Sequence, residues 1–150
     1  MNGVKRIKCN REFCVSCGLC AVVCSLAHGD EIENFLFIDK NYKLRSRNKV
    51  ARRDSVSFMN SCRNCKEPEC LKACVAGAIT KTETGIIKLD SKKCVGCWSC
   101  IMVCPNGAIT AVETEKGEKY SIKCDLCENR ESPACVDACP NKALFIEETE

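Results

Sequence analysis

Three segments of the chain share one pattern of polar and apolar positions, in which a cysteine precedes a tight turn and an apolar stretch. They are Cys74-Val-Ala-Gly-Ala-Ile-Thr, Cys104-Pro-Asn-Gly-Ala-Ile-Thr and Cys139-Pro-Asn-Lys-Ala-Leu-Phe-Ile. Each predicts a turn that leads into a short strand, and GIIKLD at residues 85–90 predicts a returning strand. Small β-hairpins are therefore expected.

The C-x3-C segments predict short helices, and little other regular structure is expected. The predicted fold class is therefore α+β. No apolar run approaches the roughly 18 to 20 residues that are needed to cross a bilayer, so we expect no direct membrane span.

Cysteine dominates the composition: 17 of the 150 residues are cysteine, whereas the large aromatic side chains are five Phe, two Tyr and Trp98. With so few aromatic anchors, an apolar core alone leaves a chain of this size marginally stable, so something bonded to the cysteines must stabilise it further. The odd number of cysteines and the lack of a secretory signal pattern argue against disulfides. We expect reduced thiols and a cytoplasmic protein, since no twin-arginine leader precedes the first motif.

Sixteen of the cysteines form four blocks of four, built from two repeated units. Blocks one and three have the compact spacing C-x2-C-x2-C-x3-C, whereas blocks two and four contain a longer loop with Pro68 or Pro133. In chain order the blocks are Cys14, Cys17, Cys20, Cys24; Cys62, Cys65, Cys70, Cys74; Cys94, Cys97, Cys100, Cys104; and Cys124, Cys127, Cys135, Cys139.

The compact spacing suits a [4Fe-4S] cluster, because three thiolates separated by two residues reach three irons of one cube while the fourth points to a neighbouring cluster. Zinc, the alternative, usually joins two separated C-x2-C pairs and has no need of a third cysteine two residues further on. Iron-sulfur clusters are therefore favoured over a zinc-binding interaction module. Cys24 and Cys74 lack the following proline of bacterial ferredoxins, a departure expected to leave the ligands intact.

The runs CVSCGLCAVVCSLAHG, CRNCKEPECLKAC, KCVGCWSCIMVCP and KCDLCENRESPACVDACP resemble the four-cluster ferredoxin-like electron-transfer subunits of anaerobic oxidoreductases. These include the iron-sulfur subunits of carbon monoxide dehydrogenase, tungsten aldehyde oxidoreductase, hydrogenase, formate dehydrogenase and dimethyl sulfoxide reductase type enzymes. The resemblance implies two bacterial 2[4Fe-4S] ferredoxin-like modules, one nested inside the other. The implied parts are an outer module of residues 1–28 and 113–150, a connecting segment of residues 29–57 with a basic strand, and an inner module of residues 58–112.

The nested arrangement implies four [4Fe-4S] clusters, although spacing alone permits other pairings of the blocks. Some relatives carry Trp in place of the second cysteine of block three and hold a three-iron cluster; here Cys97 is present, so four complete clusters are expected. The implied ligand sets are Cys14, Cys17, Cys20 and Cys139 for cluster 1; Cys24, Cys124, Cys127 and Cys135 for cluster 2; Cys62, Cys65, Cys70 and Cys104 for cluster 3; and Cys74, Cys94, Cys97 and Cys100 for cluster 4.

Two residues near the first block remain outside this ligand set. Cys9 is interpreted as a small buried residue of the entering strand. His28 either contacts a cluster or partner or lies in a turn, and both interpretations remain open.

Charged residues cluster in two places. Cations recur with period two over residues 43–50 and are followed by Arg52 and Arg53, which predicts an extended basic strand. This strand is either a solvated edge or a docking rim for a negatively charged redox partner. The glutamates near the end of the chain are expected only to solvate it: Glu147, Glu148 and Glu150.

No catalytic centre is predicted, because the sequence holds no G-x-G-x-x-G or phosphate-binding loop and each cluster has four protein ligands. Few aromatic residues interleave the basic ones, which argues against nucleic-acid binding. The predicted function is the relay of single electrons between a larger catalytic oxidoreductase subunit and a second carrier; the alternative is a free-standing polyferredoxin that serves several enzymes. The formal charge of +3 becomes about −5 with four oxidised clusters bound.

Overall fold

The structure is a computed structural model that describes residues 4–29 and 45–149. Within these ranges the chain forms short helices and strands in the order β1 (Val4–Cys9), α1 (Leu19–His28), β2 (Lys49–Arg53), β3 (Val56–Asn60), α2 (Glu69–Lys72), β4 (Ile79–Lys81), β5 (Ile87–Leu89), α3 (Ser99–Val103), β6 (Ile109–Glu113), β7 (Lys119–Lys123), α4 (Ala134–Asp137) and β8 (Leu144–Thr149).

The strands of the described chain pair as four separate two-stranded antiparallel ribbons: β1–β8, β2–β3, β4–β5 and β6–β7. Each of the three repeated turn-and-strand segments leads into a strand, since β4, β6 and β8 begin at Ile79, Ile109 and Leu144. The predicted short helices and small hairpins are therefore confirmed. The ribbon β1–β8 joins segments from opposite ends of the chain, with Ile7 opposite Ile146.

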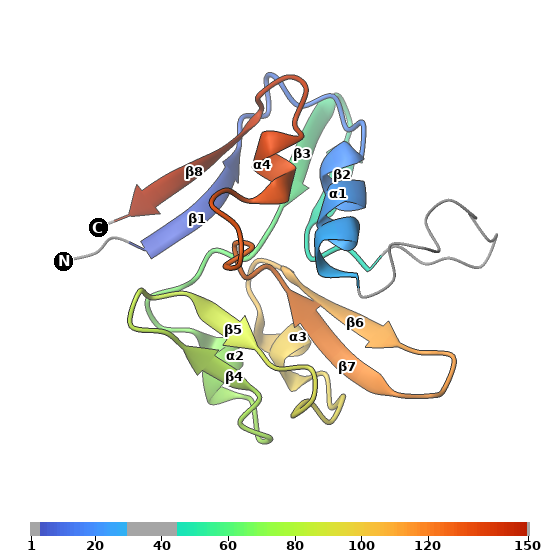
Figure 1. The fold of residues 1–150 in the computed structure, drawn as a ribbon, viewed down its shortest axis with the longest axis vertical. Coiled ribbons are helices and arrows are strands. Elements are labelled where there is room, and N and C mark those ends of the chain that lie inside the picture. The colour runs from blue at the N-terminus through green and yellow to red at the C-terminus, as the bar shows by residue number, and fades with distance from the viewer. Residues whose placement is uncertain (1–3, 30–44, 150) are drawn as a thin grey trace.

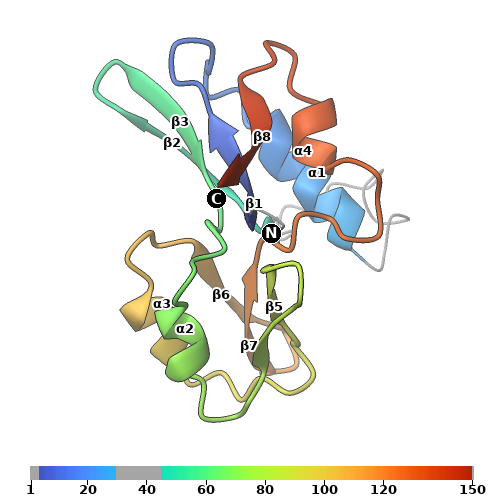
Figure 2. The same cartoon turned by 90° about the vertical axis from the view of Figure 1, so that its left-hand side faces the viewer.

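The elements gather in two halves (Figures 1 and 2). One half holds β1, α1, β2, β3, α4 and β8, and the other holds α2, β4, β5, α3, β6 and β7. Helix α1 packs against α4, and α2 packs against α3. The hairpin β6–β7 spans the module boundary predicted at residue 113, because Glu113 on β6 pairs with Lys119 on β7.

The helices of the two compact blocks differ in length, and the residue after the last cysteine accounts for the difference. Pro105 follows Cys104, and the residue before a proline is driven out of the α region, so α3 ends with Cys104 in an extended conformation. Block one has Ser25 at this point, and α1 continues over ten residues to His28. The missing proline, expected only to leave the ligands intact, thus permits a longer helix in block one. It does not impose one, because block two also lacks the proline and α2 ends at Lys72.

Cysteines form part of both buried clusters of the described chain. In the larger cluster, Cys62, Cys124 and Cys135 lie among apolar residues such as Ile7 and Leu144. The smaller cluster combines Cys100 with Ile79, Ile87 and Ile109. The apolar core is thus built around the cysteine blocks.

Two predictions about charged segments are wrong. Strand β2 begins only at Lys49, residues 45 and 46 are irregular and residues 47 and 48 form a bend, so the extended basic strand is confined to residues 49–53; residues 43 and 44 lie outside the described ranges. Glu147 does more than solvate the terminus, because its carboxylate lies 2.6 Å from the Lys8 ammonium and 2.7 Å from Arg6 Nε across the ribbon β1–β8. Lys5 pairs with Glu148 in the same way, whereas residue 150 is outside the described part.

No helix in the described ranges is long and apolar enough to span a bilayer.

Candidate metal centres

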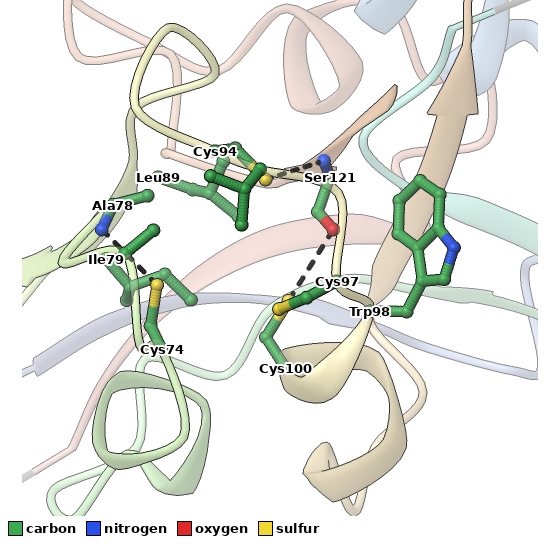
Figure 3. Close-up of a pocket in the computed structure, with 11 residues that line it drawn as sticks. Cys74, Ala78, Ile79, Leu89, Cys94, Cys97, Trp98, Cys100 and Ser121 are labelled. Atoms are coloured by element: carbon green, nitrogen blue, oxygen red, sulfur yellow. Dashed lines mark hydrogen bonds between the residues drawn. The ribbon is translucent and has the colours of Figure 1, made fainter. Parts of the chain in front are cut away.

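One cavity brings together four cysteines from blocks two and three. Its empty volume is about 310 Å³, counting the part that opens to solvent, and its lining includes Cys74, Cys94, Cys97 and Cys100. Figure 3 shows the sulfur atoms of Cys74, Cys94 and Cys100 around a common space, with Ile79 and Leu89 beside it. These four cysteines are the set that the resemblance assigns to cluster 4.

A second cavity, of about 360 Å³, brings together cysteines from the two distant ends of the chain. Its lining includes Cys14, Cys17, Cys20 and Cys139, with Met59 and Leu144. Burial, the largest cause, and the neighbouring thiols of the same set raise the pKa of Cys20 to about 11. These four cysteines are the set assigned to cluster 1.

The other two assigned sets also have members close enough to influence one another's protonation. Burial and then the charge of Cys62 raise the pKa of Cys70 to about 11, and Cys104 contributes in the same direction. Cys65, which is half-buried, belongs to the same loop as Cys62. Burial also raises the pKa of Cys135, and the thiols that add to the effect are Cys124, Cys24, Cys127 and Cys20.

These thiols are better suited to bind a metal cation than to form disulfides with one another. All 17 cysteines lie in the described ranges and are free thiols. Burial raises the pKa of Cys124 to about 12, so without a metal this group is neutral at neutral pH. Iron bound at such a site displaces the thiol protons and offsets the repulsion among the thiolates.

Backbone N–H groups point at the last cysteine of three blocks. In each case the donor is the alanine four residues further on: Ala78 to Cys74 at 3.3 Å, Ala108 to Cys104 at 3.5 Å and Ala143 to Cys139 at 3.3 Å. Such N–H to sulfur bonds stabilise the extra negative charge of a reduced cluster. The backbone N–H of the repeated alanine thus donates directly to the cysteine sulfur.

The last cysteine of block one, Cys24, has different hydrogen-bond partners. The Sγ atom of Cys24 accepts a hydrogen bond from the backbone N–H of Arg47 at 3.3 Å, and the ring Nδ1 of His28 lies 3.8 Å away. Burial alone would raise the pKa of Cys24, but the bonds from His28 and Arg47 outweigh it and lower the pKa. His28 is therefore a contact of this cysteine and not a simple turn residue.

His28 belongs to a network of charged groups. Its Nε2 atom lies 3.0 Å from Asp125 Oδ1, and Arg47 Nη1 lies 2.5 Å from Asp125 Oδ2. Burial opposes a charge on His28, but hydrogen bonds to Asp125 and to the two cysteines Cys127 and Cys24 raise its pKa to about 12. Burial opposes the charge of Asp125, but the hydrogen bond from His28 and the charge of Arg47 hold the pKa of this carboxyl far below its usual range.

Strand β7 turns polar groups toward the cysteines. Ser121 is fully buried; its N–H donates to Cys94 Sγ at 3.4 Å, and its hydroxyl lies 3.5 Å from Cys100 Sγ (Figure 3). Lys123, which is 2% exposed, donates to the carbonyl oxygens of Cys124, at 2.9 Å, and Ile87. Its positive charge favours the thiolates of Cys70 and Cys124. A buried ammonium with no ion pair in the described ranges fits a site that binds anionic clusters.

The sequence offered weak signals for these supporting residues. Asn64, also buried, donates to the Lys5 carbonyl at 2.9 Å and accepts from the Ile87 N–H, so it ties block two to β1 and β5. Its place between two cysteines of one block was its only signal. Cys9 lies in the entering strand, as predicted, but is half-buried; its sulfur accepts from the Met59 N–H at 3.4 Å.

The basic segment divides into two parts. Arg45, Arg47 and Lys49 bind other parts of the chain: Arg45 donates to the Tyr120 hydroxyl and Lys49 to the carbonyls of Gly107 and Ile109. Arg52 and Arg53 are exposed and form no ion pair with the described residues. Ser16, in the loop of block one, donates to the Ala51 carbonyl at 3.2 Å, which places these two arginines beside that loop.

Comparison with known proteins also indicates iron-sulfur chemistry. The model of the 4Fe-4S dicluster domain family matches residues 54–149. An iron-sulfur protein of Rhodospirillum rubrum is 36% identical over 92% of this chain and 79% of its own length. The putative electron transport protein YsaA of Escherichia coli is 35% identical over 91% of this chain and 85% of its own length. One subunit of the Escherichia coli anaerobic dimethyl sulfoxide reductase is 43% identical over 56% of this chain and 42% of its own length.

Among solved structures, the active-site complex BamBC of benzoyl coenzyme A reductase contains a chain with the same fold, at a TM-score of 0.52 and 23% identity. The match covers 97% of this chain and 80% of that one. The family model spans more than half of the sequence, and the cysteine cavities supply the ligand chemistry that this family requires. The chain is thus an iron-sulfur protein that belongs to the 4Fe-4S dicluster domain family.

Proposed function

We propose that the chain is an electron-transfer subunit that carries four [4Fe-4S] clusters and relays single electrons between a larger catalytic oxidoreductase subunit and a second carrier. Clusters 1 and 2 belong to the outer module and clusters 3 and 4 to the inner module, with the ligand sets given above. In this proposal β7 belongs with the inner module, because it pairs with β6. The larger subunit is of the carbon monoxide dehydrogenase, tungsten aldehyde oxidoreductase, hydrogenase or formate dehydrogenase type.

One observation carries the proposal: two separate cavities are each lined by four cysteines, three from a compact block and one from another block. The dicluster family model by itself accounts for two clusters. It begins at residue 54, after block one, so Cys14, Cys17 and Cys20 of the second cavity lie outside the matched range, which supports a further cluster there. Related proteins described as electron transport proteins support the same role.

Iron and acid-labile sulfide analysis of anaerobically purified protein tests the number of clusters. Four clusters require about 16 iron and about 16 sulfide per chain. About eight of each would leave two clusters and overturn the proposal. Zinc without sulfide would instead favour a zinc-binding module.

Paired cysteine substitutions test the assignment. Cys104→Ser in block three and Cys65→Ser in block two should change the electron paramagnetic resonance signal of one and the same cluster, cluster 3. Cys139→Ser and Cys17→Ser should likewise converge on cluster 1. If Cys104→Ser and Cys97→Ser affected one cluster and Cys65→Ser another, the blocks would not exchange their fourth ligands and the assignment would be wrong.

The two ends of the proposed relay are the clusters whose ligands reach the surface. Cys17 and Cys97 are exposed, and so are the apolar side chains that follow the first cysteine of each compact block, Val15 at 64% and Val95 at 66%. Exposed apolar groups next to a redox centre suit contact with a partner protein. Beside Cys17, the exposed Arg52 and Arg53 add positive charge, which favours a partner with an acidic surface at cluster 1.

The alternative is a free-standing polyferredoxin, and co-purification distinguishes the two. A dedicated subunit remains bound to a larger catalytic chain through mild affinity purification, whereas a diffusing carrier elutes alone. In both cases the protein transfers electrons without a catalytic site of its own. The cytoplasmic location stays a prediction.

A further inference from the structure

The hydrogen-bond geometry of His28 fixes its charge. Its Nδ1 atom lies 2.8 Å from the backbone carbonyl oxygen of Cys24, and its Nε2 atom lies 3.0 Å from a carboxylate oxygen of Asp125. A carbonyl oxygen and an ionised carboxylate both only accept hydrogen bonds. Both ring nitrogens must therefore carry a proton, and His28 is an imidazolium cation.

This cation touches two ligands of a single proposed cluster. Nδ1 lies 3.8 Å from Cys24 Sγ, and Nε2 lies 3.9 Å from Cys127 Sγ. The side chain of His28 is only 13% exposed, so solvent screens its charge little. Asp125 carries one negative charge but is also paired with Arg47, so the three groups together keep one net positive charge beside the two sulfurs.

The other three blocks have no such group. The residue four positions after the closing cysteine is Ala78, Ala108 or Ala143 in those repeats, and His28 in block one. Each alanine gives only a backbone N–H to its cysteine. His28 reaches its place because α1 runs on without a proline to its last residue. Among the four repeats, a side-chain cation at this position occurs only in block one.

We propose that His28, held by Asp125 and Arg47, gives the cluster bound by Cys24, Cys124, Cys127 and Cys135 a higher reduction potential than its partner in the same module, so that it is an electron-storage point of the relay. This rests on the proposed function. Reduction adds one electron and no proton to the cluster, and a positive charge beside the ligand sulfurs stabilises the additional negative charge. The partner cluster is bound by Cys14, Cys17, Cys20 and Cys139.

A separate metal ion is the competing explanation, since one ligand atom each from His28, Asp125 and Cys127 lie within 4.8 Å of one another. Such an ion would need the lone pairs of the His28 ring, whose nitrogens both act as donors here, and would take Cys127 away from the cluster. It would also add positive charge beside Arg47. The arrangement therefore favours a cluster-tuning role over a fifth metal site.

The test is a potentiometric titration of the intact holoprotein, followed by electron paramagnetic resonance, for wild type, His28→Gln, His28→Ala and His28→Lys. His28→Gln and His28→Ala should lower the potential of one cluster so that its ratio of reduced to oxidised form falls about tenfold at a fixed potential, which is about 59 mV for one electron. His28→Lys keeps the charge and should restore much of the shift. The other three clusters serve as internal controls and should not move.

The iron content of the variants shows whether a negative result contradicts the tuning role of His28 or the proposed function. If the wild type holds four clusters and all His28 variants keep their iron but no potential shifts, the tuning role is wrong while the proposed function stands. If His28→Gln and His28→Ala instead lose about four iron each, His28 is needed to assemble the cluster, and the tuning role is overturned. Stoichiometric zinc lost on His28→Ala would identify a separate metal site and would also overturn the tuning role.

Discussion

The ammonium group of Lys123 donates a hydrogen bond to the backbone carbonyl of Ile87, so the last residue of β7 is tied to the first residue of β5. Both residues are buried, Lys123 at 2% and Ile87 at 1% exposure. A buried ammonium is costly unless nearby negative charge compensates it. The proposed clusters next to Cys70 and Cys124, whose thiolates Lys123 favours, would provide this compensation.

Removing the charge of Lys123 should therefore lower the potentials of clusters 2 and 3. For Lys123→Gln, which keeps a hydrogen-bond donor, we expect the ratio of reduced to oxidised form to fall about tenfold, or about 59 mV. Lys123→Met should give a similar shift with a further loss of stability, since two carbonyls lose their donor. Potentiometric titration measures both. Potentials that stay at the wild-type values in both variants would show that Lys123 acts only as a hydrogen-bond donor.

Gly96 should tolerate substitution less well than Gly18, which lies in the loop of the other compact block on the other side of its second cysteine. Both have positive φ angles, +68° and +78°, so an added Cβ costs about 1–2 kcal/mol at either site. At Gly96 the Cβ would also lie 2.5 Å from the Cβ of Lys119, whereas at Gly18 nothing lies within 4 Å. Gly96→Ala should therefore lose about 1–3 kcal/mol more than Gly18→Ala. The rate at which visible cluster absorbance fades on heating compares them, and equal rates would contradict the close approach of β7.

Charge reversal at Arg53 should slow electron transfer to an acidic partner. Arg53→Glu is expected to reduce the second-order rate by about tenfold at low salt, with a larger effect in Arg52→Glu/Arg53→Glu, and the difference should shrink as ionic strength rises. Stopped-flow reduction with the co-purified partner measures this. Lys116→Glu makes the same charge change at the exposed turn between β6 and β7 and should have little effect. Equal slowing by both variants would mean that net charge, and not docking at Arg53, sets the rate.

Arg45 and Arg47 are unsuitable for that test, although the sequence pattern groups them with Arg53. Reversal at Arg47 would break its ion pair with Asp125, and reversal at Arg45 would remove its bond to Tyr120. A loss of rate in those variants would therefore report a disturbed structure and not a lost docking contact.

Removal of the clusters should unfold the chain. Several cysteines belong to the two groups of buried side chains that form the core. The strand ribbons contain only two strands each, too few to persist alone in water. After iron is removed with acid and chelator, backbone amides of β1 and β8 should lose their protection from hydrogen exchange. An apoprotein that keeps this protection and unfolds cooperatively would show that the apolar core is sufficient.

The repeats in the sequence predicted the local structure well, because cysteine spacing, proline and glycine act over a few residues. The turn after Cys104 and the strand that begins at Ile109 are examples. The bend at residues 47 and 48 was missed, since the alternating charges suggested a strand, but Arg47 binds Asp125 and Asn48 binds the carbonyl of Cys20. Those partners are far away in the chain, so no local pattern shows them.

The polar supporting groups were the least predictable part of the candidate site. Alternation along β7 would normally turn Ser121 and Lys123 toward solvent and Ile122 toward the core. The structure buries Ser121 and Lys123 instead, next to Cys94 and Cys124. An interior that holds anionic clusters favours donors and cations, so the usual rule for polar and apolar faces is reversed there. His28 and Asp125 meet for the same reason, across 97 positions of sequence.

The antiparallel pairing of β1 with β8 has a consequence for biosynthesis. All cysteines of blocks two and three have been translated once residue 104 is made, so the clusters proposed for the inner module could assemble on a nascent chain. In the proposed assignment, cluster 1 needs Cys139 as well as Cys14 and therefore waits until residue 139 has been translated. Until then the cysteines of block one lack the partner with which the proposed cluster would bind them, so their thiols stay open to oxidation and to misplaced iron while the chain is made.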